Sequence, residues 1–360
     1  MSRFQVLLYI FGMSFVFSLL LVPVFRKLAL LSGIVDKPSG RKLHHQAKPL
    51  LGGVAIFFAF FLTVDLNLAG LFAAHHWGWF PSVLQSFESI LPKVQNRLLE
   101  LGCIAAAGSL IAFLGLIDDI RGETFPYQAK FLVQFLSVGI LFAGGVRTQF
   151  MPGDVLDYVV TALWIVGIAN AFNLLDNMDG LSAGVAAIVS LLFVAIVFRQ
   201  QQIFVAFIFM ALAGSLLGFL PYNWYPSRIF MGDAGSLFVG YMIGTLTVVS
   251  SYITPETPTP VPVIIPLLVL SVPIYDTLSV LYIRWREHRP LFVGDKRHFS
   301  HRLVALGMRQ TQSVFFIYVV TLTVGITAVL LPGAQTWESW VLLFQAVLIL
   351  SLITFLMHIK

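Results

Sequence analysis

The chain has 360 residues, of which 58% are hydrophobic and only 11% charged, and its mean hydropathy is +0.89. Apolar runs long enough to cross a bilayer recur along the whole chain, which excludes a water-soluble domain. The net charge of +5 does not indicate nucleic-acid binding, because the basic residues gather in the loops between these runs. The single cysteine, Cys103, excludes an internal disulfide.

The apolar runs predict an all-α polytopic membrane protein, with one integral membrane domain over residues 1–360 and about eleven transmembrane helices. The first run is longer than the core of a typical signal peptide and lacks a small-residue cleavage site, so it is counted as a span. The predicted spans are residues 4–25, 51–72, 98–117, 131–146, 155–175, 182–198, 203–221, 236–253, 262–283, 313–331 and 339–357.

Lysine and arginine predict the orientation, because they concentrate on the cytoplasmic side of membrane proteins. Loops after odd-numbered spans and the C-terminal tail hold 17 of the 22, and the other side holds five. The N-terminus is therefore predicted to lie outside. Every stretch of the sequence that is rich in polar residues falls on the predicted cytoplasmic side. This predicts an active site at the cytoplasmic membrane edge. These stretches lie within residues 36–53, 118–130, 170–180, 223–236 and 295–302.

The third span ends directly in two acidic residues, Asp118 and Asp119. Adjacent residues point about 100° apart on a helix, so one carboxylate can face a metal while the other faces a nucleophile. A solvated helix end is the alternative interpretation of such a pair.

Four polar side chains recur at every third residue where the fifth span ends: Asn170, Asn173, Asp176 and Asp179. Positions three apart lie on nearly the same helix face, so two amides and two carboxylates are predicted on one side. Carboxylates at a membrane edge are costly to keep there without a partner such as a cation. The alternative is a polar turn between two spans.

Asp233 lies between two glycines just before the eighth span. Gly232 and Gly235 let the backbone approach a ligand closely, and the start of the following helix offers free N–H groups to an anion such as a diphosphate. Asp233 is a candidate to hold a cation that bridges the diphosphate. Carboxylates without a Cys/His ligand set favour Mg²⁺ or Mn²⁺ over Zn²⁺. The alternative is a tight turn with an acidic helix cap.

Two histidines, His298 and His301, lie in the long loop after the ninth span, among Lys296, Arg297 and Arg302. The surrounding positive charge disfavours a metal cation and favours a phosphate. The alternative is a basic loop that only follows the positive-inside rule.

Three further features are weaker candidates. The loop from Asp36 to Lys48 is basic and is predicted to contact lipid head groups or to hold a lipid phosphate. Asp65 and Asp276 lie within predicted spans, where an ionisable residue is a functional candidate by default. For Asp276, pairing with Arg284 two turns away is the first interpretation.

Taken together, these motifs resemble the polyprenyl-phosphate N-acetylhexosaminyl-1-phosphate transferases of glycosyltransferase family 4. The resemblance runs from about residue 33 to residue 303. Each motif alone is weakly specific, but five in order on one predicted membrane side are strongly so. The matching residues are Asp36, Pro38, Arg41, Lys42, His44, Pro49, Gly52, Gly53, Asp118, Asp119, Lys130, Asn170, Ala171, Asn173, Asp176, Asp179, Gly180, Asn223, Met231, Gly232, Asp233, Gly235, Ser236, His298 and His301.

The resemblance implies roles for these residues. Asp118 would activate or position a lipid phosphate, and Asp119 and Asp233 would hold Mg²⁺, with Mn²⁺ as a substitute. The other implied site residues contact the metal, the nucleotide or the phosphates. Catalytic or pocket residues are Asn170, Asn173, Asp176 and Asp179; Asn223 would bind the nucleotide; Lys48, Lys130, His298, His301 and Arg302 would bind substrate.

The resemblance also implies the reaction, in which an N-acetylhexosamine 1-phosphate passes from a UDP-sugar to undecaprenyl phosphate and UMP is released. Two departures bear on the branch: Asn177 stands where the family usually has glycine, and Ser300 replaces the middle histidine of the last motif. The consecutive histidines of the branch that uses UDP-N-acetylmuramoyl-pentapeptide are absent, so UDP-N-acetylglucosamine is the expected donor. The product would be the first lipid-linked intermediate of a cell-envelope polysaccharide such as lipopolysaccharide or teichoic acid.

The expected setting is the cytoplasmic (inner) membrane, crossed many times, with the lipid bilayer as partner and no nucleic acid. A homodimer is left open, as are the muramoyl-pentapeptide donor and a direct or a two-step mechanism. From another class, a transporter is the alternative. It is disfavoured because transport sites lie near the bilayer midplane between repeated halves, whereas here the acids gather at one edge and no repeat is visible.

Overall fold

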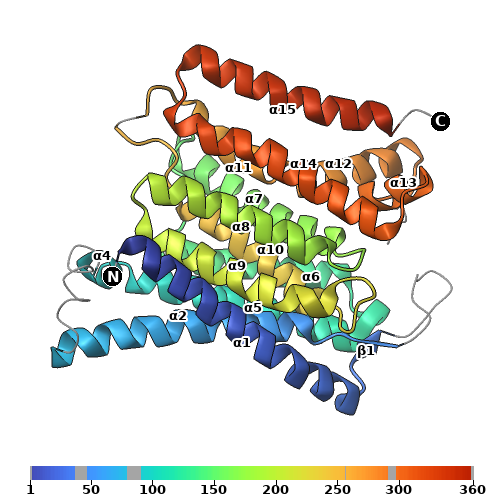
Figure 1. Ribbon diagram of the computed structural model, residues 1–360, viewed down its shortest axis with the longest axis horizontal. Helices are drawn as coiled ribbons and strands as arrows, with labels where there is room; N and C mark the ends of the chain where they lie inside the picture. The colour runs from blue at the N-terminus through green and yellow to red at the C-terminus, as the bar shows by residue number, and fades with distance from the viewer. Residues whose placement is uncertain (1, 37–46, 79–90, 256, 291–296, 358–360) are drawn as a thin grey trace.

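The computed structural model describes residues 2–36, 47–78, 91–255, 257–290 and 297–357. Long helices run side by side in one bundle (Figure 1). Between the first two of them lies a hairpin of two antiparallel strands, each two residues long. In chain order the elements are α1 (Arg3–Ser32), β1 (Val35–Asp36), β2 (Lys48–Pro49), α2 (Gly52–Trp77), α4 (Leu91–Gln95), α5 (Leu98–Arg121), η1 (Gly122–Thr124), α6 (Tyr127–Ala143), α7 (Asp154–Leu175), α8 (Leu181–Arg199), α9 (Ile203–Asn223), α10 (Gly232–Val249), η2 (Val261–Ile264), α11 (Ile265–Val269), α12 (Ser271–Arg286), α13 (Phe299–Ala305), α14 (Gln310–Leu330), η3 (Leu331–Gly333) and α15 (Thr336–Leu356).

The predicted all-α polytopic membrane fold is confirmed, because each predicted span coincides with a helix or a pair of helices. The number of full-length spans is smaller than the eleven predicted. Within the described residues, nine helices are long and apolar enough to cross a membrane, and the bent pair of η2–α11 and α12 makes a tenth. The remaining predicted span is α6, whose 17 residues place it at the lower limit of spanning length.

The ninth predicted span is bent by 69° between α11 and α12. Pro273 lies in the first turn of α12 and has no N–H to donate to the carbonyl of Val269, where α11 ends. The break therefore follows from the sequence, although the apolar pattern continues through it.

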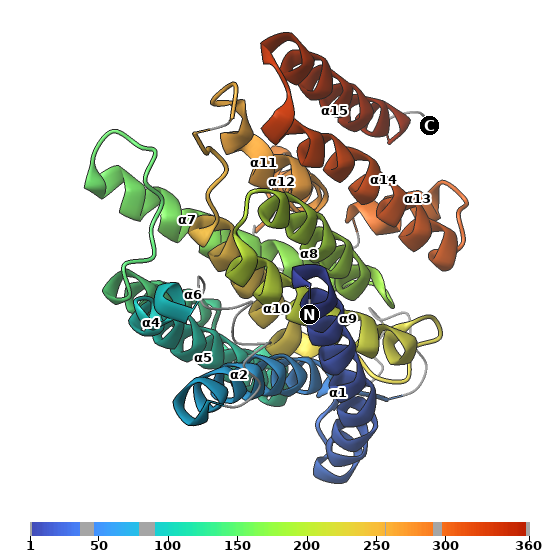
Figure 2. The same cartoon turned by 60° about the vertical axis from the view of Figure 1, so that its left-hand side comes forward.

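Burial is distributed as expected for a protein surrounded by lipid. The central helices α8, α9 and α10 are the most buried, whereas α1, α2 and α15 leave wide apolar faces uncovered, and α15 lies at the edge of the bundle (Figure 2). Leu20, Phe113 and Phe344 are each more than half exposed. Such faces are costly in water and favourable against acyl chains, so the outer helices fit a bilayer.

The polar loops meet at one end of the bundle, the end marked by β1 and α13 in Figure 1. The loop before α10 is tied to the start of α2, because Gly52 N donates to Phe230 O (3.1 Å) and Gly53 N donates to Met231 O (2.8 Å). Phe230 N in turn donates to Pro49 O (2.8 Å), which joins the hairpin to the same loop. The predicted gathering of the polar groups on one side is thereby confirmed; that this side is cytoplasmic stays a prediction.

The orientation can be tested by thiol labelling in a Cys103→Ser background, which removes the only cysteine. Tyr225 is half exposed at the polar end of the bundle, and Gln201 is exposed in the turn between α8 and α9 at the other end. We expect an impermeant maleimide to label Tyr225→Cys only from the cytoplasmic side and Gln201→Cys only from outside. Labelling of both from the same side would contradict the predicted topology.

Candidate active site

Two acidic residues and one lysine form the centre of the polar end. Asp118, in the last turn of α5, is almost fully buried and forms an ion pair with Lys130 in the first turn of α6. Lys130 Nζ also lies 3.5 Å from Oδ2 of Asp233, in the first turn of α10. The amine therefore bridges two carboxylates that would otherwise repel one another. Predicted site residues from two separate loops, on three helices, are thus brought together.

The second acid of the pair, Asp119, contacts the backbone at the start of the same helix. Its Oδ1 accepts from Asp233 N (2.8 Å), and its Oδ2 accepts from Ala234 N (3.0 Å). Both carboxylate oxygens therefore bind backbone amides in the first turn of α10. The predicted role of Asp119 as a metal ligand stays a prediction, to which the structure adds this second role.

The amides on α7 divide between two neighbouring helices. Asn173 Nδ2 donates to Asp233 Oδ1 (2.8 Å) and to Ser236 Oγ (2.9 Å), both on α10. Asn170 Nδ2 donates to Gln134 Oε1 on α6 (2.7 Å). Asn173 thus belongs to the group formed by Asp118, Lys130 and Asp233, which we call the acidic centre. Asn170, in contrast, links α7 to α6.

The two acids that follow do not continue this helix face, which corrects the prediction of four side chains on one face. Helix α7 ends at Leu175 and the chain turns. Asn177 Nδ2 donates to the free carbonyl of Leu174 (2.8 Å), and Gly180 takes a left-handed φ of 76° that favours glycine. The side-chain cap and the glycine end the helix. Asp176 and Asp179 therefore lie in a turn, residues 176–180, which we call the acidic turn.

Asp176 is half-buried in this turn, and no described residue donates a hydrogen bond to its carboxylate. Burial, and then the nearby charges of Asp233 and Asp179, raise the pKa of Asp176 to about 8. The carboxylate of Asp179 accepts from Ser227 N (2.9 Å). The carboxylate of Asp176 thus lacks a donor and is affected by the charges of two other acids, an arrangement that a bound cation would relieve.

The turn is held by side chains distant in sequence. Asn223, fully buried at the end of α9, accepts from Gly180 N (3.0 Å) and donates to Ile229 O (3.0 Å). Its amide is therefore occupied by backbone, and its predicted contact with the nucleotide stays a prediction. Lys48 Nζ likewise donates to the carbonyl of Ser227, the same residue whose backbone N–H binds Asp179.

Two further positioning residues were missed by the sequence analysis. The hydroxyl of Tyr318, on α14, donates to Gly180 O, and Ser300 Oγ, on α13, donates to Asn177 Oδ1 (2.6 Å). Ser300 was noted only as a departure from the family motif. Tyr318 lies in an apolar run, where no sequence signal separates it from core packing.

Removal of the Tyr318 hydroxyl should loosen the acidic turn without disturbing the helix that carries it. We expect Tyr318→Phe to lower kcat about tenfold, because small displacements of catalytic groups are costly even when the fold is intact. Steady-state turnover measures this, with Tyr9→Phe on the exposed face of α1 as the matched control. Equal rates for the two variants would show that the Tyr318 hydroxyl does not position the turn.

The segment that carries His298 and His301, which we call the histidine loop, is fixed to α12. His298 Nδ1 lies 2.8 Å from Asp276 Oδ2, and Phe299 N donates to the other oxygen of that carboxylate. Asp276 therefore pairs with His298, and not with Arg284 as first interpreted, because the loop folds back across the helix. Arg302 donates to Ser279 Oγ (2.8 Å), while its buried Nε has no acceptor among the described residues.

The described residues do not by themselves form a complete metal site. Among the described residues, no three His, Cys, Asp or Glu side chains converge closely enough to hold one. Mg²⁺ commonly binds proteins through one or two carboxylates and takes its other ligands from water and substrate phosphates. The acidic centre fits that mode of binding and does not resemble a closed structural zinc site.

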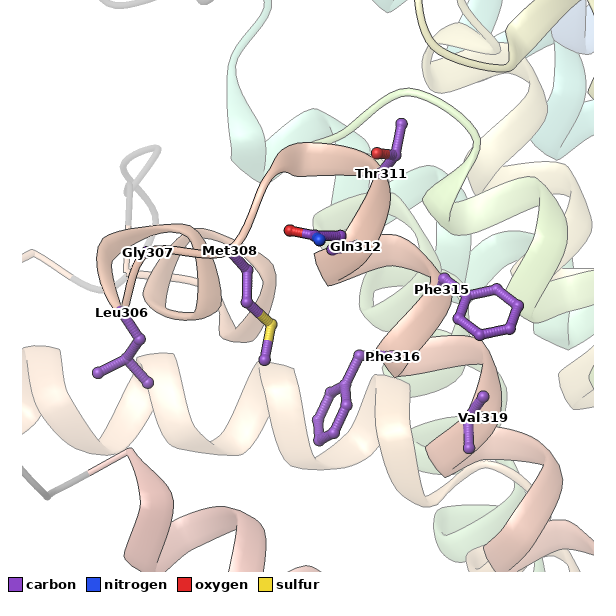
Figure 3. A pocket seen from close by; sticks show the side chains of 8 residues that line it. All are labelled: Leu306, Gly307, Met308, Thr311, Gln312, Phe315, Phe316 and Val319. Carbon is purple, nitrogen blue, oxygen red and sulfur yellow. The ribbon is translucent and has the colours of Figure 1, made fainter.

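A groove beside α13 and the start of α14 is separate from the acidic centre (Figure 3). Met308 and Phe316 point into it, and none of the predicted site residues lines it. Its lining residues are Leu306, Gly307, Met308, Thr311, Gln312, Phe315, Phe316 and Val319.

The chain is similar to known proteins over most of its length. The model of glycosyl transferase family 4 matches residues 101–251, which include both acids of α5, the acidic turn and the start of α10. The probable undecaprenyl-phosphate N-acetylglucosaminyl 1-phosphate transferase of Bacillus subtilis (strain 168) is 31% identical, over 95% of this chain and 90% of that protein. The decaprenyl-phosphate N-acetylglucosaminephosphotransferase of Mycolicibacterium smegmatis is also 31% identical, over 84% of this chain and 76% of its own length.

A more distant relative extends the same comparison. The undecaprenyl-phosphate alpha-N-acetylglucosaminyl 1-phosphate transferase of Yersinia pestis is 24% identical, over 95% of this chain and 87% of that protein. The similarity therefore covers nearly the whole membrane domain as well as the acidic centre. This chain belongs to glycosyl transferase family 4.

Proposed function

We propose that this protein is a transferase that moves N-acetylglucosamine 1-phosphate from UDP-N-acetylglucosamine to undecaprenyl phosphate, releasing UMP. The names of the relatives support the donor sugar and the polyprenyl acceptor. The observation that carries the proposal is the bridge of Lys130 between Asp118 and Asp233, at the polar end of a membrane domain. A polyprenyl tail can stay in the bilayer there while its phosphate meets a water-soluble nucleotide.

In the reaction, a phosphate oxygen of the lipid attacks the β-phosphorus of the UDP-sugar. The bond from that phosphorus to the bridging oxygen breaks, and UMP leaves with the electron pair. Lys130 offsets negative charge on the phosphates, and Asp118 orients Lys130 through their ion pair. Catalysis of this kind depends on alignment of two anionic partners and on charge neutralisation, which are the functions this centre can supply.

Mg²⁺ fits the centre, with Mn²⁺ as a substitute, because Asp176 is a half-buried carboxylate without a donor beside two other acids. Asp233 and Asp176 are the candidate ligands, because both oxygens of Asp119 already bind backbone amides. The cation, when bound, would neutralise charge on the diphosphate and on the departing UMP. Asn173 keeps one oxygen of Asp233 directed toward α7.

The histidine loop and the hairpin are the proposed substrate contacts. Arg302 carries a buried Nε–H without an acceptor among the described residues, and His298 and His301 lie on the same short segment, with ring centroids 6.4 Å apart. We assign these three side chains to a phosphate of the donor or acceptor, and Lys48 to the substrate. The predicted location is the cytoplasmic (inner) membrane, and the product would be the first lipid-linked intermediate of a cell-envelope polysaccharide.

A UMP-release assay tests the proposal on protein purified in detergent, with undecaprenyl phosphate, Mg²⁺ and a panel of UDP-sugars. We expect release with UDP-N-acetylglucosamine, and none when the lipid is omitted. Release only with UDP-N-acetylmuramoyl-pentapeptide would change the branch within the family. No release with any sugar would contradict the proposed reaction and favour the transporter alternative.

A further inference from the structure

Helix α10 lacks an N-terminal cap from its own sequence. Its first-turn amides have no acceptor within the helix, and Met231 at the N-cap position makes no side-chain hydrogen bond to them. A serine, threonine, asparagine or aspartate normally provides this acceptor. Here Asp119, from the end of α5, provides it for the second and third residues of the helix, Asp233 and Ala234, at 2.8 and 3.0 Å.

The close approach of α5 to α10 depends on two glycines. A Cβ on Gly232, whose φ is +71°, would lie 2.5 Å from Asp119 Oδ2. A Cβ on Gly115, one turn before Asp119, would lie 2.3 Å from the backbone oxygen of Asp233. Two separate positions without side chains thus allow one carboxylate to reach the start of the neighbouring helix.

The position of Asp233 follows from this contact. Its backbone N–H is bound by Asp119, while its side chain extends away to Asn173 and Lys130. Both oxygens of Asp119 are engaged by backbone amides that are fixed in the helix, whereas the partners of Asp233 are side chains that can move aside for a substrate or cation.

We propose that Asp119 is a positioning residue that caps α10 from outside and thereby places Asp233, and that it is not itself a metal ligand. This inference rests on the proposed function, because it assigns separate tasks to two acids of the same site. It predicts that substitution of either acid lowers turnover, but that only Asp233 changes the preference of the site among metals.

Cysteine substitution separates the two tasks, because a thiolate binds Cd²⁺ far better than it binds Mg²⁺. In the Cys103→Ser background, Asp233→Cys and Asp119→Cys are titrated with Cd²⁺ and UDP-N-acetylglucosamine, and the ultraviolet charge-transfer absorbance of a cadmium–thiolate bond is recorded. We expect the band for Asp233→Cys and none for Asp119→Cys, with folding checked by gel filtration. A saturable band for Asp119→Cys would overturn the proposal.

A second measurement uses the glycine that the contact requires. Gly232→Ala and Asp119→Asn should each lower kcat at least tenfold, with the KM for UDP-N-acetylglucosamine changed less than threefold. The double variant should be no slower than the slower single variant, because both changes break one contact. Gly167→Ala, where a Cβ meets nothing within 4 Å, is the control. Additive losses in the double variant would contradict the shared contact and overturn the proposal.

The failure of the proposed function would look different. In that case the Cys103→Ser background protein would release no UMP with any donor, whereas the cadmium spectra need no turnover. A band for both cysteine variants in a protein that does release UMP would leave the function standing and refute only the positioning role of Asp119.

Discussion

Asp233→Asn should reduce kcat by about a thousandfold while the protein stays folded. The side chain of Asp233 is where α6 and α7 converge on α10: Asn173 donates to one oxygen and Lys130 approaches the other. Asparagine keeps the volume but removes the charge that would face a cation beside the diphosphate. Loss of one such electrostatic contact in a desolvated site costs about 10²–10³ in rate.

The measurement is steady-state UMP release at saturating UDP-N-acetylglucosamine, with Mg²⁺ varied. Asp154→Asn is the matched control, because Asp154 is largely exposed at the start of α7 and pairs only with Arg147 among the described residues. We expect the control to retain near-normal kcat. A kcat for Asp233→Asn within threefold of the unmodified protein would remove Asp233 from the catalytic centre.

Lys130→Met should be the second most damaging change, with kcat/KM lowered about 10²–10³-fold. The amine lies between Asp118 and Asp233, so its loss leaves two close carboxylates without their shared cation. We expect them to repel each other and one of them to take up a proton, since like charges at short range disfavour the ionised form. The site would then lose both its phosphate contact and the orientation of Asp118.

Lys130→Arg provides a sharper comparison than the neutral variant alone. Arginine keeps the charge but presents it as a planar fork, which does not reproduce a compact amine between two acids. We expect partial activity for Lys130→Arg and near-normal activity for the control Arg121→Met, whose guanidinium lies over Phe125 at the exposed end of α5. If Lys130→Met and Arg121→Met lose the same small factor, Lys130 only contributes to the positive charge of the membrane edge.

The membrane architecture could be predicted from sequence because lipid leaves few choices. A chain segment in the bilayer must satisfy its backbone hydrogen bonds internally, so every apolar run of sufficient length becomes a helix. Successive loops alternate between the two sides of the membrane, so loops after odd-numbered spans share one side. This places the polar stretches together without any knowledge of helix packing. The bend at Pro273 escaped the prediction, because hydropathy does not register a missing backbone N–H.

The candidate site was predicted as a set of residues more accurately than as a geometry. Asp118, Lys130, Asn173 and Asp233 do converge, although Asp233 lies 115 positions after Asp118 in the chain. The spacing of three was read as one continuous helix face, but the turn after Leu175 places Asp176 outside it. A periodic pattern cannot show where a side-chain cap and a left-handed glycine will end the helix.

What a polar residue contacts was also beyond the sequence. Asn223 and Asn170 are polar residues in family motifs, yet their amides bind protein groups, the backbone in one case and Gln134 in the other. Tyr318 carries no motif and still holds the acidic turn. These partners lie on separate helices and become neighbours only through packing, so no local pattern records them.

The position of the label after transfer tests the central claim most directly. UDP-N-acetylglucosamine carrying ³²P in its β-phosphate is incubated with the purified protein, undecaprenyl phosphate and Mg²⁺, and the lipid and nucleotide fractions are separated. Attack at the β-phosphorus moves the label into the lipid fraction and releases unlabelled UMP, and this is the result we predict. Labelled UDP with an unlabelled glycolipid would mean that the sugar alone is transferred, and would contradict the assignment of the acidic centre to phosphoryl transfer.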